Sequence, residues 1–103
     1  MTSSSDRWPA CDSLDQVREN IDRLDRVIAP LMCERAHYVN QAAKFKDSEA
    51  AVIVPERIQA IVDKVRSMAE AEGANPDLLE AIYRAMIDAY IVDEQARWRE
   101  INE

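Results

Sequence analysis

Between Leu14 and Lys46, apolar residues recur in alternating steps of three and four positions, and this spacing constrains the fold more than any other feature. The residues are Leu14, Val17, Ile21, Leu24, Ile28, Leu31, Tyr38, Ala42 and Phe45. They form one stripe, which we call the seam, on a helix that packs lengthwise against other helices. Arg35 interrupts the seam after Leu31. Because a guanidinium group is permanently charged and has five N–H donors, Arg35 is a poor core residue and needs an anion.

Local signals set the ends of this long helix. Ser13 and Gln16 form a capping box at its start, and we predict that the helix runs to about Asp47. Pro30 lies inside the helix, where a proline removes one backbone hydrogen bond and clashes with the preceding turn. We therefore expect a kink near Ala29, and the alternative is a break into two helices.

Two shorter helices are predicted after a short connection. Pro55 suits the first turn of a second helix, and Gly73 suits its C-terminal cap. Asn75 and Pro76 begin a third helix as cap and first helical residue, and this helix runs to about Ile101. The inward stripes are Ile58, Ile61, Val62, Val65, Met68 and Ala69 in the second helix, and Leu79, Ile82, Tyr83, Met86, Ile87, Tyr90, Ile91 and Trp98 in the third.

The composition is typical of a single all-α domain, since the chain has 103 residues and only one Gly. We expect a flexible tail over residues 1–11 and one helical domain over residues 12–103. A first helix of about thirty residues is near 50 Å long, and two shorter helices cannot cover such a seam within one compact chain. The sequence therefore predicts an intertwined homodimer in which the long helices pack side by side.

Charge and composition argue against several classes of function. A formal net charge of −7 is unfavourable for binding nucleic acid or an anionic membrane. No segment is long and apolar enough for a membrane helix, and the Ser-rich N-terminus is neither a signal nor a transit peptide. Cys11 and Cys33 would lie some 30 Å apart on one helix, too far for a disulfide, which indicates the reducing cytoplasm. With His37 as the one histidine and no close cysteine pair, we expect no zinc site and no other metal.

A group of charged residues converges on one region of the predicted fold. Arg35 and Lys46 are eleven residues apart, or three helical turns, so we expect both on the same face of the first helix. Val39 and Ala42 lie between them and are small enough to leave a hollow. Glu94 interrupts the inward stripe of the third helix and adds a carboxyl group.

Two further arginines complete this candidate site. Arg57 is in the first turn of the second helix, beside the expected mouth of the hollow, and an antiparallel partner chain would bring its Arg18 towards Arg35. Several cations, one carboxyl group and no metal suit a small substrate with two carboxylates, gripped bidentately by arginine. Catalysis there would rest on positioning and electrostatics rather than on a covalent nucleophile. Each residue alone has an ordinary structural explanation, so the interpretation depends on their joint occurrence.

Five segments, in this order and spacing, carry a family resemblance: VRENIDRLD at 17–25, ER at 34–35, FKDSEAA at 45–51, VPER at 54–57 and YIVDE at 90–94. On these segments the chain resembles the all-α class of chorismate mutases, and most closely their isochorismate pyruvate-lyase relatives. The likeness covers about Leu14 to Trp98. It implies an intertwined three-helix homodimer with two equivalent active sites, no cofactor, and the rearrangement of chorismate to prephenate. The lyase branch instead eliminates pyruvate from isochorismate and gives salicylate.

The resemblance also implies roles for the candidate residues. Arg18 of the partner chain would bind a substrate carboxylate, and Arg35 would bind the carboxylate of the enolpyruvyl side chain. Lys46 would lie beside the ether oxygen and Arg57 near the ring. Glu94 falls where the family has Gln or Glu as a second donor to the ether oxygen.

The pattern of the two branches is mixed in this sequence. Tyr90, one turn before Glu94, would line the pocket. Mutases usually have Asp at the position of Val54, where it serves the ring hydroxyl, whereas the FKDSEAA segment matches the lyase branch. Lyases have Gln at the position of Glu94.

Chorismate mutase activity is the first prediction, because every cation that the rearrangement uses is present and a carboxylic acid at Glu94 is compatible with it. Isochorismate pyruvate-lyase activity, alone or in the same site, is the alternative. Further alternatives are a non-catalytic helical dimerisation module and a family member whose catalysis has decayed. Since a carboxylic acid donates only when protonated, we hypothesise that activity falls as pH rises through the titration of Glu94.

Overall fold

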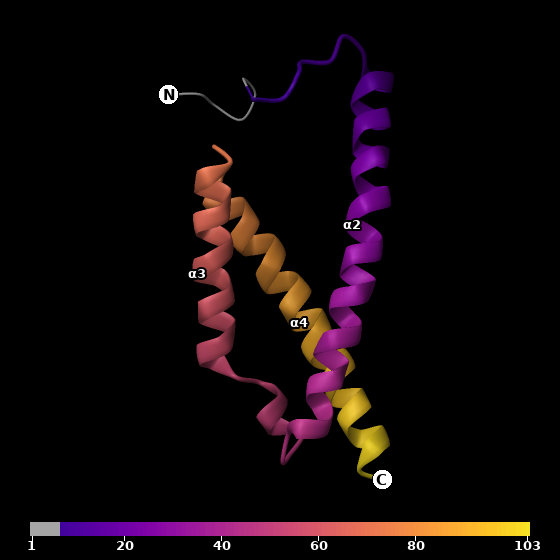
Figure 1. The fold of residues 1–103 in the computed structure, drawn as a ribbon, viewed down its shortest axis with the longest axis vertical. Coiled ribbons are helices and arrows are strands. Elements are labelled where there is room, and N and C mark those ends of the chain that lie inside the picture. The colour runs from indigo at the N-terminus through magenta and orange to yellow at the C-terminus, as the bar shows by residue number, and fades with distance from the viewer. Residues whose placement is uncertain (1–6) are drawn as a thin grey trace.

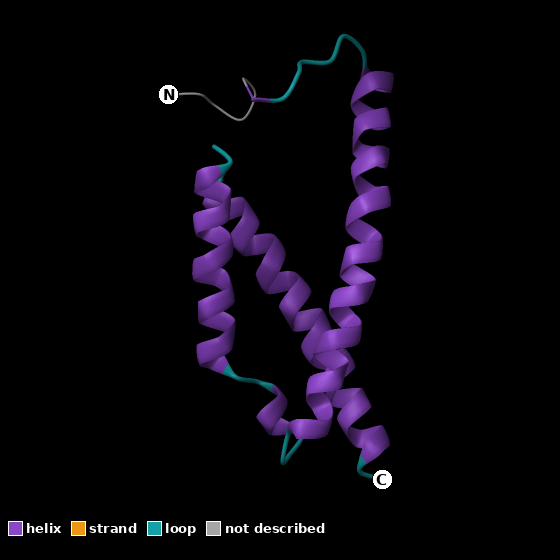
Figure 2. Ribbon diagram, in the orientation of Figure 1, coloured by secondary structure: helices purple, strands orange, loops and turns teal. Residues whose placement is uncertain are grey.

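The computed structural model describes residues 7–103, and these residues form an all-α fold. In chain order the elements are α2 (Leu14–Ala42), the 3₁₀ turns η1 (Ala43–Phe45) and η2 (Ala50–Val52), α3 (Pro55–Ala71) and α4 (Pro76–Ile101), with no strand among the described residues (Figure 2). The prediction of an all-α chain with one long and two shorter helices is confirmed. The predicted tail over residues 1–11 falls largely on residues 1–6, which lie outside the described residues. No helix of the described chain is both long and apolar enough to cross a membrane.

The start of α2 follows the predicted capping pattern. The Ser13 hydroxyl accepts the backbone N–H of Gln16 at 3.1 Å, and the Gln16 side chain accepts the backbone N–H of Asp12 at 2.8 Å. Both bonds satisfy backbone donors near the N-terminus of the helix. The helix is continuous through Pro30, so the alternative of a break into two helices is wrong.

The predicted end of the first helix is wrong. The α-helix ends at Ala42, five residues before Asp47, and the chain tightens into η1. Lys46 caps this turn with φ −98° and ψ 139°, an extended conformation, and its N–H donates to the Ala43 carbonyl at 3.2 Å. Lys46 is therefore not part of the helix that carries Arg35, and a count of α-helical turns does not give its direction.

A tight turn joins α3 to α4 as predicted. Gly73 has φ 71°, the left-handed conformation that favours glycine. Its N–H donates to the Glu70 carbonyl at 3.0 Å, and the Ala74 N–H donates to the Ala69 carbonyl at 2.8 Å. This is the Schellman pattern of helix termination. Asn75 then caps α4 by accepting the N–H of Asp77 at 3.0 Å, with Pro76 at the first helical position.

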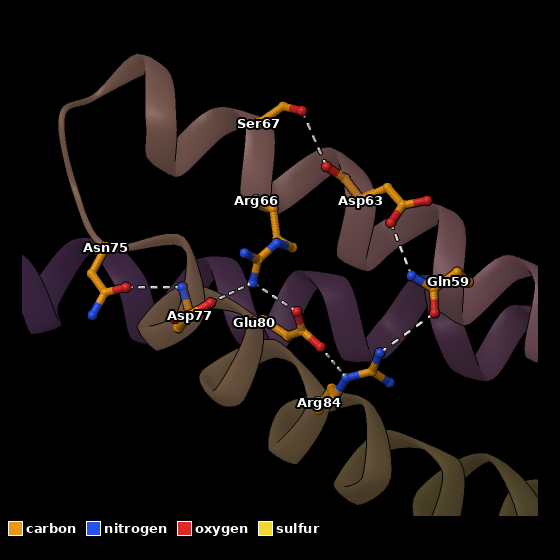
Figure 3. Close-up of polar contacts among 8 residues, drawn as sticks. All are labelled: Gln59, Asp63, Arg66, Ser67, Asn75, Asp77, Glu80 and Arg84. Carbon is orange, nitrogen blue, oxygen red and sulfur yellow. Dashed lines mark hydrogen bonds and ion pairs between the residues drawn. The ribbon is translucent and has the colours of Figure 1, made fainter.

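The hairpin of α3 and α4 contains most of the buried core. Val62, Val65, Ala69 and Ile87 are its buried apolar residues. On its outer side Arg66 donates to Asp77 at 2.9 Å and to Glu80 at 2.8 Å, and Arg84 donates to Glu80 at 2.7 Å (Figure 3). The hydrogen bond from Arg84, aided by that from Arg66, lowers the pKa of Glu80 below its ordinary value of 4.5.

The single chain is elongated and leaves the seam of α2 uncovered. It measures 55 × 28 × 15 Å, and its radius of gyration of 17.2 Å exceeds the ~13 Å typical of a compact chain of this length. Figure 1 shows α4 crossing α2 near the C-terminal end of α2, while the N-terminal part of α2 stands apart from the other helices. Helix α2 has no buried residue. The exposed seam residues, each 38–77 % exposed, are Leu14, Val17, Ile21, Leu24, Ile28, Leu31, Tyr38 and Phe45.

Candidate active site

One cavity of about 340 Å³ lies where α2, the connection after it, α3 and α4 meet. Its charged residues are Arg35, Lys46, Arg57 and Glu94. Its remaining wall consists of Tyr38, Val39, Ala42, Val52, Val54, Ile58, Ile61, Ile87, Tyr90 and Ile91. A mostly apolar wall with a few convergent polar groups is typical of a small-molecule site.

Arg35 is held at the cavity by aromatic rings rather than by a carboxylate. Its guanidinium carbon lies 5.1 Å from the ring centroid of Tyr90 and 5.9 Å from that of Tyr83, within the range of cation–π attraction. The Tyr90 hydroxyl donates to the Met32 carbonyl at 2.6 Å, which fixes the ring against α2. Since no carboxylate of residues 7–103 forms an ion pair with Arg35, this half-buried cation is available to an anionic ligand.

Lys46 and Glu94 form the most enclosed polar part of the cavity. Glu94 is buried on α4, 4 % exposed, and Lys46 Nζ lies 3.5 Å from its Oε2 atom. Within the described chain that oxygen is buried and has no hydrogen-bond partner. Because a buried polar atom without a hydrogen bond is costly, the arrangement favours a polar ligand atom between Lys46 and Glu94.

The backbone of Lys46 is tied to α4 by a contact that the sequence did not reveal. The indole N–H of Trp98 donates to the Lys46 carbonyl at 3.0 Å. The apolar stripe predicted for the third helix includes Trp98. A hydrogen bond to a backbone carbonyl 52 residues away could not be predicted from any sequence pattern. This bond helps to keep Lys46 at the cavity although it lies beyond the end of α2.

Arg57 and Val54 flank the start of α3 at the cavity. Arg57 is exposed in the first helical turn, and its N–H donates to the Val54 carbonyl at 3.0 Å. A cation is unfavourable beside the positive end of a helix dipole, so a bound anion would relieve the repulsion. Val54 is half-buried and contributes an apolar side chain to the wall.

Arg18 is the candidate residue that the chain does not bring to the cavity. It is exposed near the start of α2, and seventeen helical residues, about 25 Å, separate it from Arg35. Arg35, Lys46, Arg57, Tyr90 and Glu94 all line the cavity. Within the described residues, no group of three or more His, Cys, Asp or Glu is arranged to hold a metal.

The charge pattern defines the ligand that the cavity suits. Arg35, Lys46 and Arg57 supply three cations, and Glu94 supplies one carboxyl group. A ligand with two carboxylates would offset most of this positive charge, while its uncharged body contacts the apolar wall. A polar atom between Lys46 and Glu94 would sit where charge developing during a reaction is stabilised.

Known proteins are similar to this chain over most of its length. Residues 17–95 match the family described as chorismate mutase type II. The chain is 36 % identical over 90 residues to an isochorismate pyruvate lyase of Pseudomonas aeruginosa, which covers 87 % of this chain and 89 % of that protein. It is also 33 % identical over 93 residues to a T-protein of Haemophilus influenzae, covering 88 % of this chain but 25 % of that longer protein. A T-protein of Enterobacter agglomerans is 32 % identical over 75 residues, covering 72 % of this chain and 20 % of that protein.

Proposed function

We propose, from the premise that this chain belongs to the chorismate mutase type II family, that it rearranges chorismate to prephenate in the cavity between its three helices. The observation that carries the proposal is the pair of Lys46 and buried Glu94: the Glu94 Oε2 atom lies 3.5 Å from the ammonium nitrogen and has no hydrogen bond within the described chain. The substrate would place its ether oxygen between these two groups. Lys46 donates as an ammonium, and Glu94 donates when protonated.

The remaining cations of the cavity would contact other parts of the substrate. Arg35, which has no carboxylate partner among the described residues, would bind the carboxylate of the enolpyruvyl side chain through both arms of its guanidinium group. Arg57 would lie near the ring, and Tyr90 would hold Arg35 in place while lining the pocket.

The rearrangement is pericyclic and needs neither a covalent nucleophile nor a cofactor. The ether C–O bond breaks while a carbon–carbon bond forms between the enolpyruvyl group and the ring, so no atom leaves the substrate. The protein's task is to hold the reactive conformer and to stabilise charge that grows on the ether oxygen. The carboxylate grips would serve the first requirement, and Lys46 with Glu94 would serve the second.

We also propose that the active form is an intertwined homodimer. The seam of α2 is exposed along its whole N-terminal part, and one chain is far from compact. A second copy would bury both seams. The partner's α2, packed antiparallel, would then bring its Arg18 towards the cavity as a further cation for a substrate carboxylate.

Elimination of pyruvate from isochorismate, giving salicylate, is the second candidate function. Two observations favour it. The relative named for this lyase matches this chain over 89 % of its own length, and Val54 supplies an apolar side chain where a mutase usually has an Asp to serve the ring hydroxyl. Both reactions break the same kind of ether bond, so one site can support both.

The proposed location is the cytoplasm. Cys11 and Cys33 are both free and exposed. Free thiols persist in a reducing compartment.

The test is to incubate the purified protein separately with chorismate and with isochorismate, following prephenate and pyruvate in each reaction. We expect prephenate from chorismate, at a rate abolished by Lys46→Ala. Fast pyruvate and salicylate from isochorismate, with slow prephenate, would assign the protein to the second function. No product from either substrate would refute both and favour a non-catalytic helical dimer.

A further inference from the structure

We propose that Trp98 is the positioning residue for Lys46: by holding the Lys46 carbonyl, its indole N–H keeps the ammonium group beside Glu94 in the cavity. Its kinetic consequence rests on the proposed function, in which that ammonium stabilises the ether oxygen. The bond itself, Trp98 Nε1 to Lys46 O at 3.0 Å, is a property of the fold.

Lys46 needs such an anchor because the helix before it has ended. Its backbone is extended at the end of a single 3₁₀ turn, held on its N-terminal side by one hydrogen bond to the Ala43 carbonyl. Beyond it a bend of three residues leads to η2. The lysine side chain adds a flexible four-carbon stem, whose ordering costs conformational entropy. Without a fixed main chain, the ammonium would sample positions away from Glu94.

Helix α4 contacts Lys46 at two points, its backbone carbonyl and its side-chain ammonium group. Glu94 and Trp98 are four residues apart, so their side chains project from the same face of α4 one turn apart. The Glu94 carboxyl group reaches the ammonium at 3.5 Å, and the Trp98 indole reaches the carbonyl. One rigid helix therefore fixes both the main chain and the ammonium group of Lys46.

The last turn of α4 is itself secured. The Asn102 side-chain amide donates to the Trp98 carbonyl at 2.8 Å, which satisfies an acceptor at the C-terminus of the helix. The next residue, Arg99, forms an ion pair with Glu49 in the same connection. That pair is about half exposed on both sides, and exposed ion pairs contribute little, so the indole bond is the stronger of these two polar contacts.

The experiment removes only the indole N–H. In the full-length protein Trp98 is replaced by 3-benzothienylalanine, which keeps the fused ring but has sulfur in place of the N–H group. The matched control is the same replacement at Trp8, which is 50 % exposed and remote from the cavity residues in sequence. Trp98→Phe serves as a second variant. Steady-state kinetics gives kcat and KM, and hydrogen exchange by NMR reports the backbone N–H of Lys46, with Val65 in the core of α3 as internal reference.

At position 98 we expect kcat to fall about three- to tenfold, the range that corresponds to one neutral hydrogen bond. KM should stay within about twofold, because the arginines rather than Lys46 bind the carboxylates. Exchange at Lys46 should accelerate by a similar factor, while exchange at Val65 and all properties of the Trp8 control stay unchanged.

Two results would overturn the proposal. Unchanged exchange at Lys46 would show that the indole bond does not hold this residue. Faster exchange with unchanged kcat would show that the bond is structural and does not position the ammonium for the reaction. If the native protein converts neither substrate, the proposed function fails separately, and the exchange measurement still decides whether Trp98 fixes Lys46.

Discussion

Two arginines of this chain, Arg35 and Arg66, should respond to the same substitution in opposite ways. Arg35 faces the cavity without a carboxylate partner among the described residues, whereas Arg66 bridges Asp77 and Glu80 on the outside of the hairpin. Replacement by Met keeps an unbranched apolar stem and removes the charge and the donors. Arg35→Met should therefore abolish substrate binding with little effect on the fold, and Arg66→Met should weaken the fold with little effect on binding.

The size of the Arg35 effect follows from its contacts. A bidentate grip on a substrate carboxylate consists of two charge-assisted hydrogen bonds, each contributing about 1.5–3 kcal/mol. Their loss corresponds to a fall in kcat/KM of about 10²- to 10⁴-fold. In the free protein the Arg35→Met substitution removes two cation–π contacts of about 0.5–1 kcal/mol each. Contacts of the Met sulfur with the same rings partly replace them.

The assay measures kcat/KM with chorismate and isochorismate and the midpoint of thermal unfolding for both variants. We expect Arg35→Met to lose activity and keep a midpoint within a few degrees of the native one. Arg66→Met should show a lower midpoint and near-native kcat/KM. A loss of less than about tenfold in Arg35→Met would refute the carboxylate role, and an unfolded Arg35→Met protein would show that this cation is structural.

Three further perturbations give distinct signatures. Glu94→Gln should keep most of kcat, since the side-chain amide also donates a hydrogen bond to the ether oxygen; a loss as large as that of Lys46→Ala would remove Glu94 from the donor role. Leu24→Glu places a charge on the exposed seam, and light scattering should show the 11.8 kDa chain instead of the proposed dimer, whereas a native-sized assembly would contradict the proposed interface. Glu80 has a lowered pKa in the folded state, so its stabilising effect is present above its unfolded pKa and is lost as pH falls below 4.5; unfolding midpoints across acidic pH should therefore fall less steeply in Glu80→Gln, and parallel curves would contradict this.

The ends of the helices could be predicted where a single residue type dictates backbone geometry. Pro55, Gly73 and Asn75 each stand where the sequence places a helix boundary. Local steric and capping preferences decide these positions. The end of α2 was not predictable in this way, because the change from α-helix to 3₁₀ turn at Ala43 involves no residue that forbids a helix.

The candidate site was predictable to the extent that it violates a pattern. Arg35 in an apolar seam and Glu94 in an apolar stripe are exceptions visible in the sequence, and the structure places both at one cavity. The bonds that orient the site are not visible in this way. These are the hydrogen bonds from Trp98 to the Lys46 carbonyl and from Tyr90 to the Met32 carbonyl. In each bond the donor is an aromatic side chain that could equally serve only for packing, and the acceptor is a backbone group that every residue has.

The uneven distribution of buried residues has a consequence for how the chain folds. Helices α3 and α4 are neighbours in sequence, share most of the core and are joined by the turn at Gly73, so they meet with little loss of chain entropy. The hairpin should therefore form early, in a step whose rate does not depend on protein concentration. Helix α2 has no buried residue of its own, so in the proposed homodimer its final ordering should follow second-order kinetics, slowing as the protein is diluted. Refolding traces at several concentrations would separate the two steps.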